Sequence, residues 1–393
     1  MIRYLTAGES HGEALVGIVE GVPAGLPLTA GAIDHHLARR WLGFGRGGRA
    51  KIEQDRVHIY SGVRFAKTLG SPIAFRLDNA AYRKDRSGWP AVMAVEGSGE
   101  GVEKVTLPRP GHADLVGAQK YGFDDIRPVI DRASARETAM RVACCSVARL
   151  LLRHFGIEVG SHVVRIGAVG YEGGPSAWQG RVEALLAEGA EAVNRAADAS
   201  EVRMLDSDLS ARCIEHIKDT KRQGDSLGGV YEVVVTGLPP GLGSYVQWDR
   251  RLDGLLAQAI LSIQAQKGVE VGDGVEGAAR PGSQVHDPIV QEEGRYRRAT
   301  NHAGGIEGGV TNGMPVVVRG YMKPIPTLIK PLGTVDLASG EAQPTRYERS
   351  DVTSVPAAST VAEAVVAHVL ANAFLEKYGG DSVAEITARY AAP

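Results

Sequence analysis

Glycine recurs along the whole of this sequence and limits how far any helix or strand can run. It accounts for 50 of 393 residues, nearly twice the usual share of about 7%. The glycines follow no collagen-like period and form no low-complexity block. Because glycine accepts backbone conformations that other residues avoid, this distribution predicts many turns and close backbone approaches. Backbone-lined ligand pockets are often built in this way.

The apolar pattern predicts strands and helices that do not alternate strictly. Short strands are expected over Ile2–Leu5 and Ala14–Val19, on either side of the turn at 8–12. Without regular βαβ units, the mixture favours an α+β fold over a doubly wound parallel sheet. Further strands are predicted over Val230–Thr236 and Pro315–Arg319, and helices over Ala30–Leu42 with Thr29 as cap, from the capping box Ser134–Glu137 onward, over Leu252–Gln266 and over Thr360–Lys377.

Charge and cysteine content exclude several classes of protein. The formal net charge of -2 argues against a dedicated nucleic-acid-binding protein, which would carry a basic excess. The three cysteines cannot form an even disulfide framework. No leader is visible, and no run approaches the roughly 20 apolar residues that span a bilayer. We therefore expect a cytoplasmic protein that binds neither membranes nor nucleic acid.

One glycine-rich stretch imitates a dinucleotide-binding motif. Gly43–Gly48 satisfies G-x-G-x-x-G, but it follows a predicted helix and precedes an extended stretch at Ala50–Glu53, the reverse of the required order. Its arginines suggest another use, because guanidinium groups among glycines can converge on a phosphorylated anion. A solvated basic loop is the open alternative. The arginines in and beside this stretch are Arg39, Arg40, Arg46 and Arg49.

Two of the 11 histidines stand out by their local sequence. His11 and His112 each lie in a glycine turn, and a histidine held on a rigid turn suits proton transfer near neutral pH. A structural role for each stays open at this point. The helical histidines have no partner at metal-ligand spacing, so no metal site is expected; they are His35, His36, His154, His216 and His368.

Three later segments complete the set of candidate site residues. The glycine-dense loop Asn301–Gly309 and the proline-stiffened segment Lys323–Thr327 are suited to holding a cofactor phosphate. Arg349-Ser350-Asp351 places a carboxylate beside an arginine, for which a surface ion pair is the plain alternative.

Taken in order, these segments resemble the chorismate synthase family over nearly the whole chain. The likeness rests on G-E-S-H-G-x-x-L-V-G-I-V-E-G-V-P from Gly8, on R-A-S-A-R-E-T from Arg132, and on Arg349 through Glu363. Gly-Phe-Gly-Arg, Pro-Arg-Pro-Gly-His-Ala-Asp and Lys-Pro-Ile-Pro-Thr also match. The resemblance implies a single large α+β domain over 1–393, with helices sandwiched between antiparallel sheets, assembled as a homotetramer. We expect segment 80–104 to be a mobile active-site loop and segment 171–210 to be peripheral.

The resemblance also implies a reaction, in which phosphate is eliminated from 5-enolpyruvylshikimate 3-phosphate to give chorismate for aromatic amino acid biosynthesis. The implied cofactor is reduced FMN (FMNH2), with NADPH only an indirect source of electrons through an external flavin reductase. His11 would protonate the departing phosphate, His112 would stabilise negative charge on the reduced flavin, and Asp351 would help relay the C6 proton. No role is expected for His302.

The remaining site residues follow from the same resemblance. Those implied for the substrate are Ser10, Arg40, Arg46, Arg49, Arg109, Arg136 and Arg349. Those implied for the flavin are Arg132, Ala133, Ser134, Gln264, Ala265, Gly308, Lys323, Pro324, Ile325, Pro326, Thr327 and Arg349. The alternatives are a flavin oxidoreductase that uses NAD(P)H and a non-enzymatic protein that binds phosphate or RNA.

Overall fold

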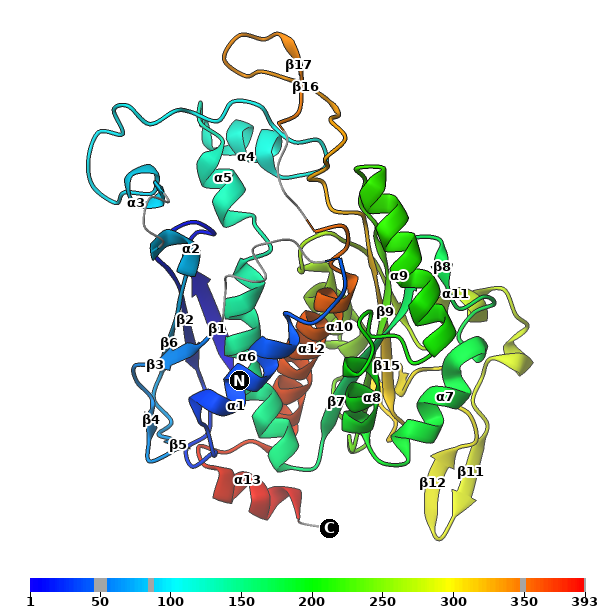
Figure 1. The fold of residues 1–393 in the computed structure, drawn as a ribbon. Helices are drawn as coiled ribbons and strands as arrows, with labels where there is room; N and C mark the ends of the chain where they lie inside the picture. The colour runs from blue at the N-terminus through cyan, green and yellow to red at the C-terminus, as the bar shows by residue number, and fades with distance from the viewer. Residues whose placement is uncertain (46–54, 84–87, 347–350, 392–393) are drawn as a thin grey trace.

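Two antiparallel sheets enclose a central pair of helices in the computed structural model, which describes residues 1–45, 55–83, 88–346 and 351–391. The smaller sheet has the strand order β1-β2-β6-β3, and the larger has the order β10-β15-β9-β7-β8. Helix α6 (Glu137–His154) packs on β1 and β2, while α12 (Val355–Tyr378) packs on β7 and β9 and against α6. The layers are therefore sheet, helix, helix, sheet (Figure 1), which confirms the predicted α+β sandwich.

The remaining elements surround these four layers. The other strands of the two sheets are β1 (Arg3–Ala7), β2 (Ala14–Glu20), β3 (Val57–Ile59), β6 (Ile73–Asp78), β7 (Glu158–Ile166), β8 (Val169–Gly170), β9 (Gly229–Thr236), β10 (Gln266–Val271) and β15 (Val316–Met322). Four hairpins pair β4 (Val63–Arg64) with β5 (Lys67–Thr68), β11 (Ile289–Glu292) with β12 (Arg295–Arg298), β13 (Ile306–Glu307) with β14 (Val310–Thr311), and β16 (Gly333–Val335) with β17 (Ala342–Pro344). The outer helices are α1 (Ala30–Arg39), α2 (Ala80–Arg83), α3 (Trp89–Val92), α4 (Asp114–Tyr121), α5 (Arg127–Arg132), α7 (Ser176–Leu186), α8 (Ala190–Asp198), α9 (Ser207–Arg222), α10 (Leu252–Leu261), α11 (Gly274–Ala278) and α13 (Val383–Tyr390), with 3-10 turns η2 (Trp248–Arg250) and η3 (Gly282–Gln284).

Small residues let the helix layer approach the smaller sheet. At Gly17 of β2, a Cβ atom would lie 2.5 Å from the Cys144 sulfur and 2.6 Å from the Met140 sulfur of α6. Helix α12 is mostly apolar and is buried over most of its length. It alone in the described residues is long and apolar enough to cross a membrane, but 83% of its most apolar window is buried within the fold.

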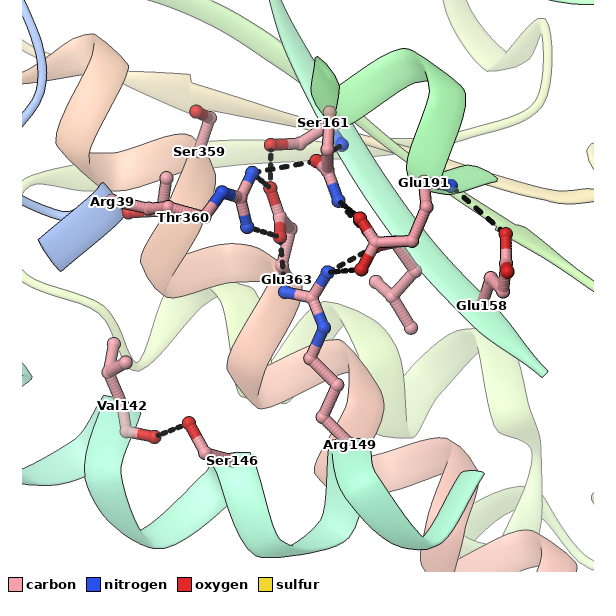
Figure 2. A network of polar contacts seen from close by, with 12 residues as sticks. Arg39, Val142, Ser146, Arg149, Glu158, Ser161, Glu191, Ser359, Thr360 and Glu363 are labelled. Atoms are coloured by element: carbon pink, nitrogen blue, oxygen red, sulfur yellow. Dashed lines mark hydrogen bonds and ion pairs between the residues drawn. The ribbon is translucent and has the colours of Figure 1, made fainter. Parts of the chain in front are cut away.

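A buried ionic network ties α12 to its surroundings (Figure 2). The carboxylate of Glu363, which is fully buried, accepts from Arg39 at 2.6 and 3.0 Å and from Arg149 and Ser161. Asn194 of α8 accepts from Arg39 at 2.7 Å. These contacts show that Arg39 belongs to the core rather than to an anion-binding loop. Segment 171–210, which we expected to be peripheral, packs α8 on β7 and adds buried side chains such as Trp178 and Val193 to the fold.

Three helix predictions need correction at their ends. Helix α1 has the predicted Thr29 cap, which accepts from the Ala32 N–H at 3.2 Å, but it ends at Arg39. Helix α6 begins at Glu137 with no side-chain cap: the Ser134 hydroxyl accepts from the Arg136 N–H at 3.3 Å, ahead of the helix, and the Glu137 carboxylate accepts from Thr6 at 2.8 Å. Helix α10 ends at Leu261 since Ala265 adopts a left-handed backbone (φ +67°) before β10.

The other predicted elements match the structure closely. Strands β1 and β2 form the expected pair around the 8–12 turn, with Leu5 opposite Ile18. The predicted strands near 230 and 315 are the neighbours β9 and β15. Helix α12, the last of the predicted helices, begins at Val355, five residues before the predicted Thr360, and ends before Gly379 as expected.

Candidate active site

The first part of the site is the turn at 8–12 between β1 and β2. Gly8 has a φ of +103°, and a Cβ there would lie 2.5 Å from the Ala14 carbonyl oxygen, so only glycine fits without strain. The buried Asn79 side chain donates to the Gly12 carbonyl at 2.7 Å and to the Glu9 carbonyl at 3.1 Å. The Ser10 N–H donates to the Asp131 carbonyl at 3.1 Å. The turn is therefore anchored from both sides.

His11 is oriented by two neighbours. Its Nδ1 lies 2.6 Å from the Asp131 carboxylate, which also accepts from the His11 backbone N–H at 3.0 Å. Its ring stacks on Trp89 with a centroid distance of 3.9 Å and an interplanar angle of 17°. Because a carboxylate only accepts hydrogen bonds, this contact places a proton on Nδ1 and makes Nε2 the nitrogen for proton exchange.

Two substrate-binding candidates are joined by one buried carboxylate. Asp55 lies 2.9 Å from Arg40 and 2.5 Å from Arg136. Burial opposes the charge of Asp55, but the two guanidinium groups outweigh it and hold the pKa of this carboxyl below its usual range. Arg136 also donates to Asn79 at 3.0 Å. Since Asn79 fastens the His11 turn, the arginine pair is held in register with His11.

The second part of the site is the turn that carries His112. Arg109 donates to Asp114 at 2.8 Å and to Thr327 at 3.1 Å. The His112 Nδ1 lies 2.5 Å from Asp114 and 3.1 Å from Arg109; the shorter contact decides the tautomer, so Nδ1 donates to Asp114. Burial opposes the Asp114 charge, yet bonds from His112 and Arg109 hold its pKa well below the usual range. Lys323 donates to the Gly111 carbonyl, closing the turn.

A chain of contacts connects the two turns. Arg132 donates to the Thr6 carbonyl at 3.1 Å, Thr6 donates to Glu137, and Gln264 donates to Glu137 at 3.3 Å. The Lys323 N–H then donates to the Ala265 carbonyl at 3.0 Å. The structure thus brings Arg132, Gln264, Ala265 and Lys323 into one chain of contacts.

Smaller contacts place the remaining cofactor-binding candidates. Ser134, between α5 and α6, donates to the buried Ser10 hydroxyl at 3.2 Å, and Ala133 closes α5. The Ile325 carbonyl accepts from Ser226 at 2.6 Å, and a Cβ at Gly111 would lie 3.5 Å from the Pro326 Cβ, so the segment Lys323–Thr327, which includes Pro324, lies against the His112 turn. Gly308 lies elsewhere, in the β13–β14 turn beside Tyr245.

The residues of this region fit a flavin phosphate and an electron-rich ring. Lys323, Arg132 and Arg109 supply cations for anionic groups. Gln264 offers a buried Oε1 that accepts no hydrogen bond from the part of the chain that the structure describes. A buried acceptor of this kind calls for a donor from a ligand or solvent.

Asp351 lies at the start of the segment that leads into α12. Its carboxylate accepts from Ser354 at 3.3 Å, and the next residue, Val352, donates to the Gly45 carbonyl at 2.9 Å. The base of the arginine loop and Asp351 are therefore neighbours. Arg46, Arg49, Arg349 and the extended stretch predicted at Ala50–Glu53 lie outside the described residues.

Four residues with close contacts to the site were given no role from the sequence. Asp55, Asn79 and Asp131 are buried polar residues whose partners are far away in sequence, and Trp89 lies in a segment without periodicity. Asp114, two residues after His112, carried the one local signal. His302 pairs with Asp273 at 2.7 Å, away from both turns, so nothing here gives it a role in the site.

The comparisons with known proteins agree over nearly the full length. The sequence model of the chorismate synthase family matches residues 2–375. A chorismate synthase of Salinibacter ruber is 71% identical, covering 98% of this chain and 97% of the relative. One from Chlorobaculum tepidum is 56% identical over 99% of this chain and 96% of the relative.

A solved structure gives the same result for the fold. A crystal structure of chorismate synthase superposes with a TM-score of 0.78 at 42% identity, covering 99% of this chain and 96% of the other. None of these comparisons supports the alternatives of an NAD(P)H oxidoreductase or a phosphate- or RNA-binding protein. The chain therefore belongs to the chorismate synthase family, and it is a lyase that forms chorismate by eliminating phosphate from 5-enolpyruvylshikimate 3-phosphate.

Proposed function

We propose that this chain performs the elimination with reduced FMN held between the His11 and His112 turns. The supporting observation is the chain of contacts from Thr6 and Arg132 through Glu137 and Gln264 to Lys323. It links the strand before the His11 turn to Lys323, which bonds the His112 turn, so a proton-transfer histidine lies near one end and cations near the other. The chemistry that a bound reduced flavin supplies is electron density for the substrate as phosphate leaves.

His11 protonates the departing phosphate in this proposal. Phosphate leaves poorly as a dianion, so a proton delivered from Nε2 lowers the barrier. Arg40 and Arg136, fixed by Asp55, bind the anionic groups of the substrate together with Ser10, and the loop residues Arg46, Arg49 and Arg349 are proposed to join them. Positive charge at this one place explains how a chain of net charge -2 attracts a multiply anionic substrate.

The other turn serves the cofactor. His112, bonded to the Asp114 carboxylate, stabilises negative charge on the reduced ring system. Arg109, which bonds the same carboxylate, is proposed to bind the substrate. Lys323–Thr327, Arg132–Ser134, Gln264 and Ala265 hold the cofactor, and Gly308 is proposed to join them from the β13–β14 turn. Asp351 is proposed to help relay the C6 proton of the substrate.

Cofactor binding can be tested separately from turnover. Oxidised and dithionite-reduced FMN are titrated anaerobically into the protein, and binding is followed by flavin fluorescence. Lys323→Ala is expected to weaken binding about tenfold, because it removes a charged contact of roughly 1.4 kcal/mol. The matched control Lys377→Ala removes another lysine that donates to a backbone carbonyl, that of Pro240, and should leave binding unchanged. Equal affinities of both variants and wild type would contradict the assignment.

We further propose a homotetramer that buries the outer face of the smaller sheet. Opposite α6, this face exposes three apolar side chains, Leu5 (67% exposed), Val16 (41%) and Ile18 (46%). A contiguous apolar face is a common site of association. Light scattering should give four chains for wild type and fewer for Ile18→Lys. A wild-type monomer would contradict the proposal.

Segment 80–104 is proposed to act as a mobile loop over the site. Trp89 of this segment stacks on His11, so its position is coupled to the catalytic turn. Ligand should slow proteolysis of this segment, and unchanged cleavage would count against it. We propose a cytoplasmic location with an external flavin reductase, which predicts negligible NADPH oxidation by the purified protein with FMN.

A further inference from the structure

The Asp131 carboxylate makes its described polar contacts with His11 alone. Its side chain is 1% exposed, and Oδ1 accepts from both the backbone N–H and the Nδ1 of His11. Its Oδ2 accepts no hydrogen bond from the described residues, and His11 is its one ion-pair partner among them. A buried carboxylate with this partner set is costly to keep, so stability does not account for it.

We propose that Asp131 is the positioning residue of His11. It determines that the exchangeable proton of His11 resides on Nε2. This inference rests on the proposed role of His11 as the acid for the departing phosphate. In that step the Nε2–H bond breaks, an O–H bond forms on the phosphate as its bond to carbon breaks, and the ring stays protonated at Nδ1 against Asp131. Without Asp131, either nitrogen could carry the proton of the neutral ring.

The surroundings of the pair support an orienting role. Asp131 lies at the end of α5, directly before Arg132, and its carbonyl accepts from the Ser10 N–H. One element therefore positions the acid, Ser10 and the first cofactor-binding candidate. Trp89 covers one face of the ring, and the Arg127 guanidinium lies 5.7 Å from the Trp89 ring. Stacking on Trp89 sets the plane of the His11 ring, and the bond to Asp131 sets both the tautomer and the direction in which Nε2 points.

A double-mutant cycle tests the proposal. Asp131→Asn keeps the size of the side chain and an acceptor for the His11 N–H but removes the charge. We expect kcat to fall about 10²-fold and KM to change less than about threefold. In a His11→Ala background the same substitution should have no further effect, because residues that act as a unit are non-additive. Asp219→Asn, in an exposed ion pair on α9, is the matched control and should match wild type.

The outcomes separate this inference from the proposed function. Full activity in His11→Ala would remove the acid role itself. Loss of activity in His11→Ala with an unchanged Asp131→Asn would overturn only the positioning role, as would additive losses in the double variant.

A measurement on the unaltered protein covers the case in which Asp131→Asn fails to fold. In ¹⁵N-histidine-labelled wild type, the His11 ring signals are identified by their loss in His11→Ala. The proposal expects a protonated Nδ1 in the neutral ring. A neutral ring with its proton on Nε2 would overturn it.

Discussion

Removing the charge of Glu363 should destabilise the fold without touching the reaction. The carboxylate of Glu363 is fully buried and contacts Arg39, Arg149 and Arg203. Asp198 and Glu191 also contact these arginines, so three carboxylates balance three guanidinium groups. Glu363→Gln leaves one buried positive charge uncompensated. Breaking a buried ion pair from one side costs about 3–5 kcal/mol.

This cost converts to a shift in the midpoint of thermal unfolding. The unfolding entropy is about 2.1 cal/mol/K per residue, or roughly 0.8 kcal/mol/K for 393 residues. The midpoint should therefore fall by about 4–6 °C, as measured by differential scanning calorimetry. The control is Glu376→Gln. Glu376 lies on the same helix as Glu363 and forms an exposed ion pair with Arg250, so its loss should cost at most about 1 kcal/mol. Equal midpoints for Glu363→Gln and wild type would refute the reasoning.

The pH dependence of this difference has a definite sign. Burial opposes the charge of Glu363, but Arg39, Arg149 and Arg203 outweigh it and hold its pKa well below the usual range. A carboxylate whose pKa is lower in the folded state contributes stability that is complete above its unfolded pKa, about 4.3, and is lost as the pH falls. The gap between wild type and Glu363→Gln should therefore be largest at neutral pH and shrink below about pH 4. A gap that widens in acid would contradict the assignment.

Three further predictions concern the site and the layer beneath it. Asp55→Asn should lower kcat/KM about tenfold by loosening Arg40 and Arg136, and steady-state kinetics with unchanged values would refute this. Asp114→Asn should weaken FMN binding several-fold in fluorescence titrations, since Arg109 and His112 lose their common acceptor; unaltered affinity would refute it. Gly17→Ala should cost about 1–3 kcal/mol in urea unfolding because its methyl group meets the Met140 and Cys144 sulfurs. Gly31→Ala, which has open space in α1, is its control and should be neutral or stabilising, so equal effects would refute the packing argument.

The regular elements of this fold follow from local sequence, whereas the partners of the site do not. Periodicity was enough to predict β1, β2 and most of α12. The Ser134 capping box failed because the Glu137 carboxylate bonds Thr6 instead of reaching back to Ser134, and the Ser134 hydroxyl accepts from the Arg136 N–H and donates to Ser10. Tertiary contacts can override local capping preference in this way.

The same reason explains which site residues were found. His11 and His112 could be singled out because each lies in a glycine turn, and the family resemblance supplied roles for them. Asp131 is separated from His11 by 120 positions, and Asp55 from Arg136 by 81. No single-sequence pattern links residues so far apart. Arg39 likewise pairs with Glu363 across 324 positions. For this reason the sequence grouped Arg39 with the anion-binding arginines, although it is a core residue.

The most direct test of the account is single-turnover chemistry without oxygen. The protein is mixed anaerobically with 5-enolpyruvylshikimate 3-phosphate and chemically reduced FMN, and chorismate absorbance and released phosphate are followed together. The account predicts equal amounts of both products with reduced FMN and none with oxidised FMN, and it predicts that His11→Ala and His112→Ala fold normally but turn over about 10²-fold more slowly. Absence of product with reduced FMN, or full rates in either histidine variant, would contradict it.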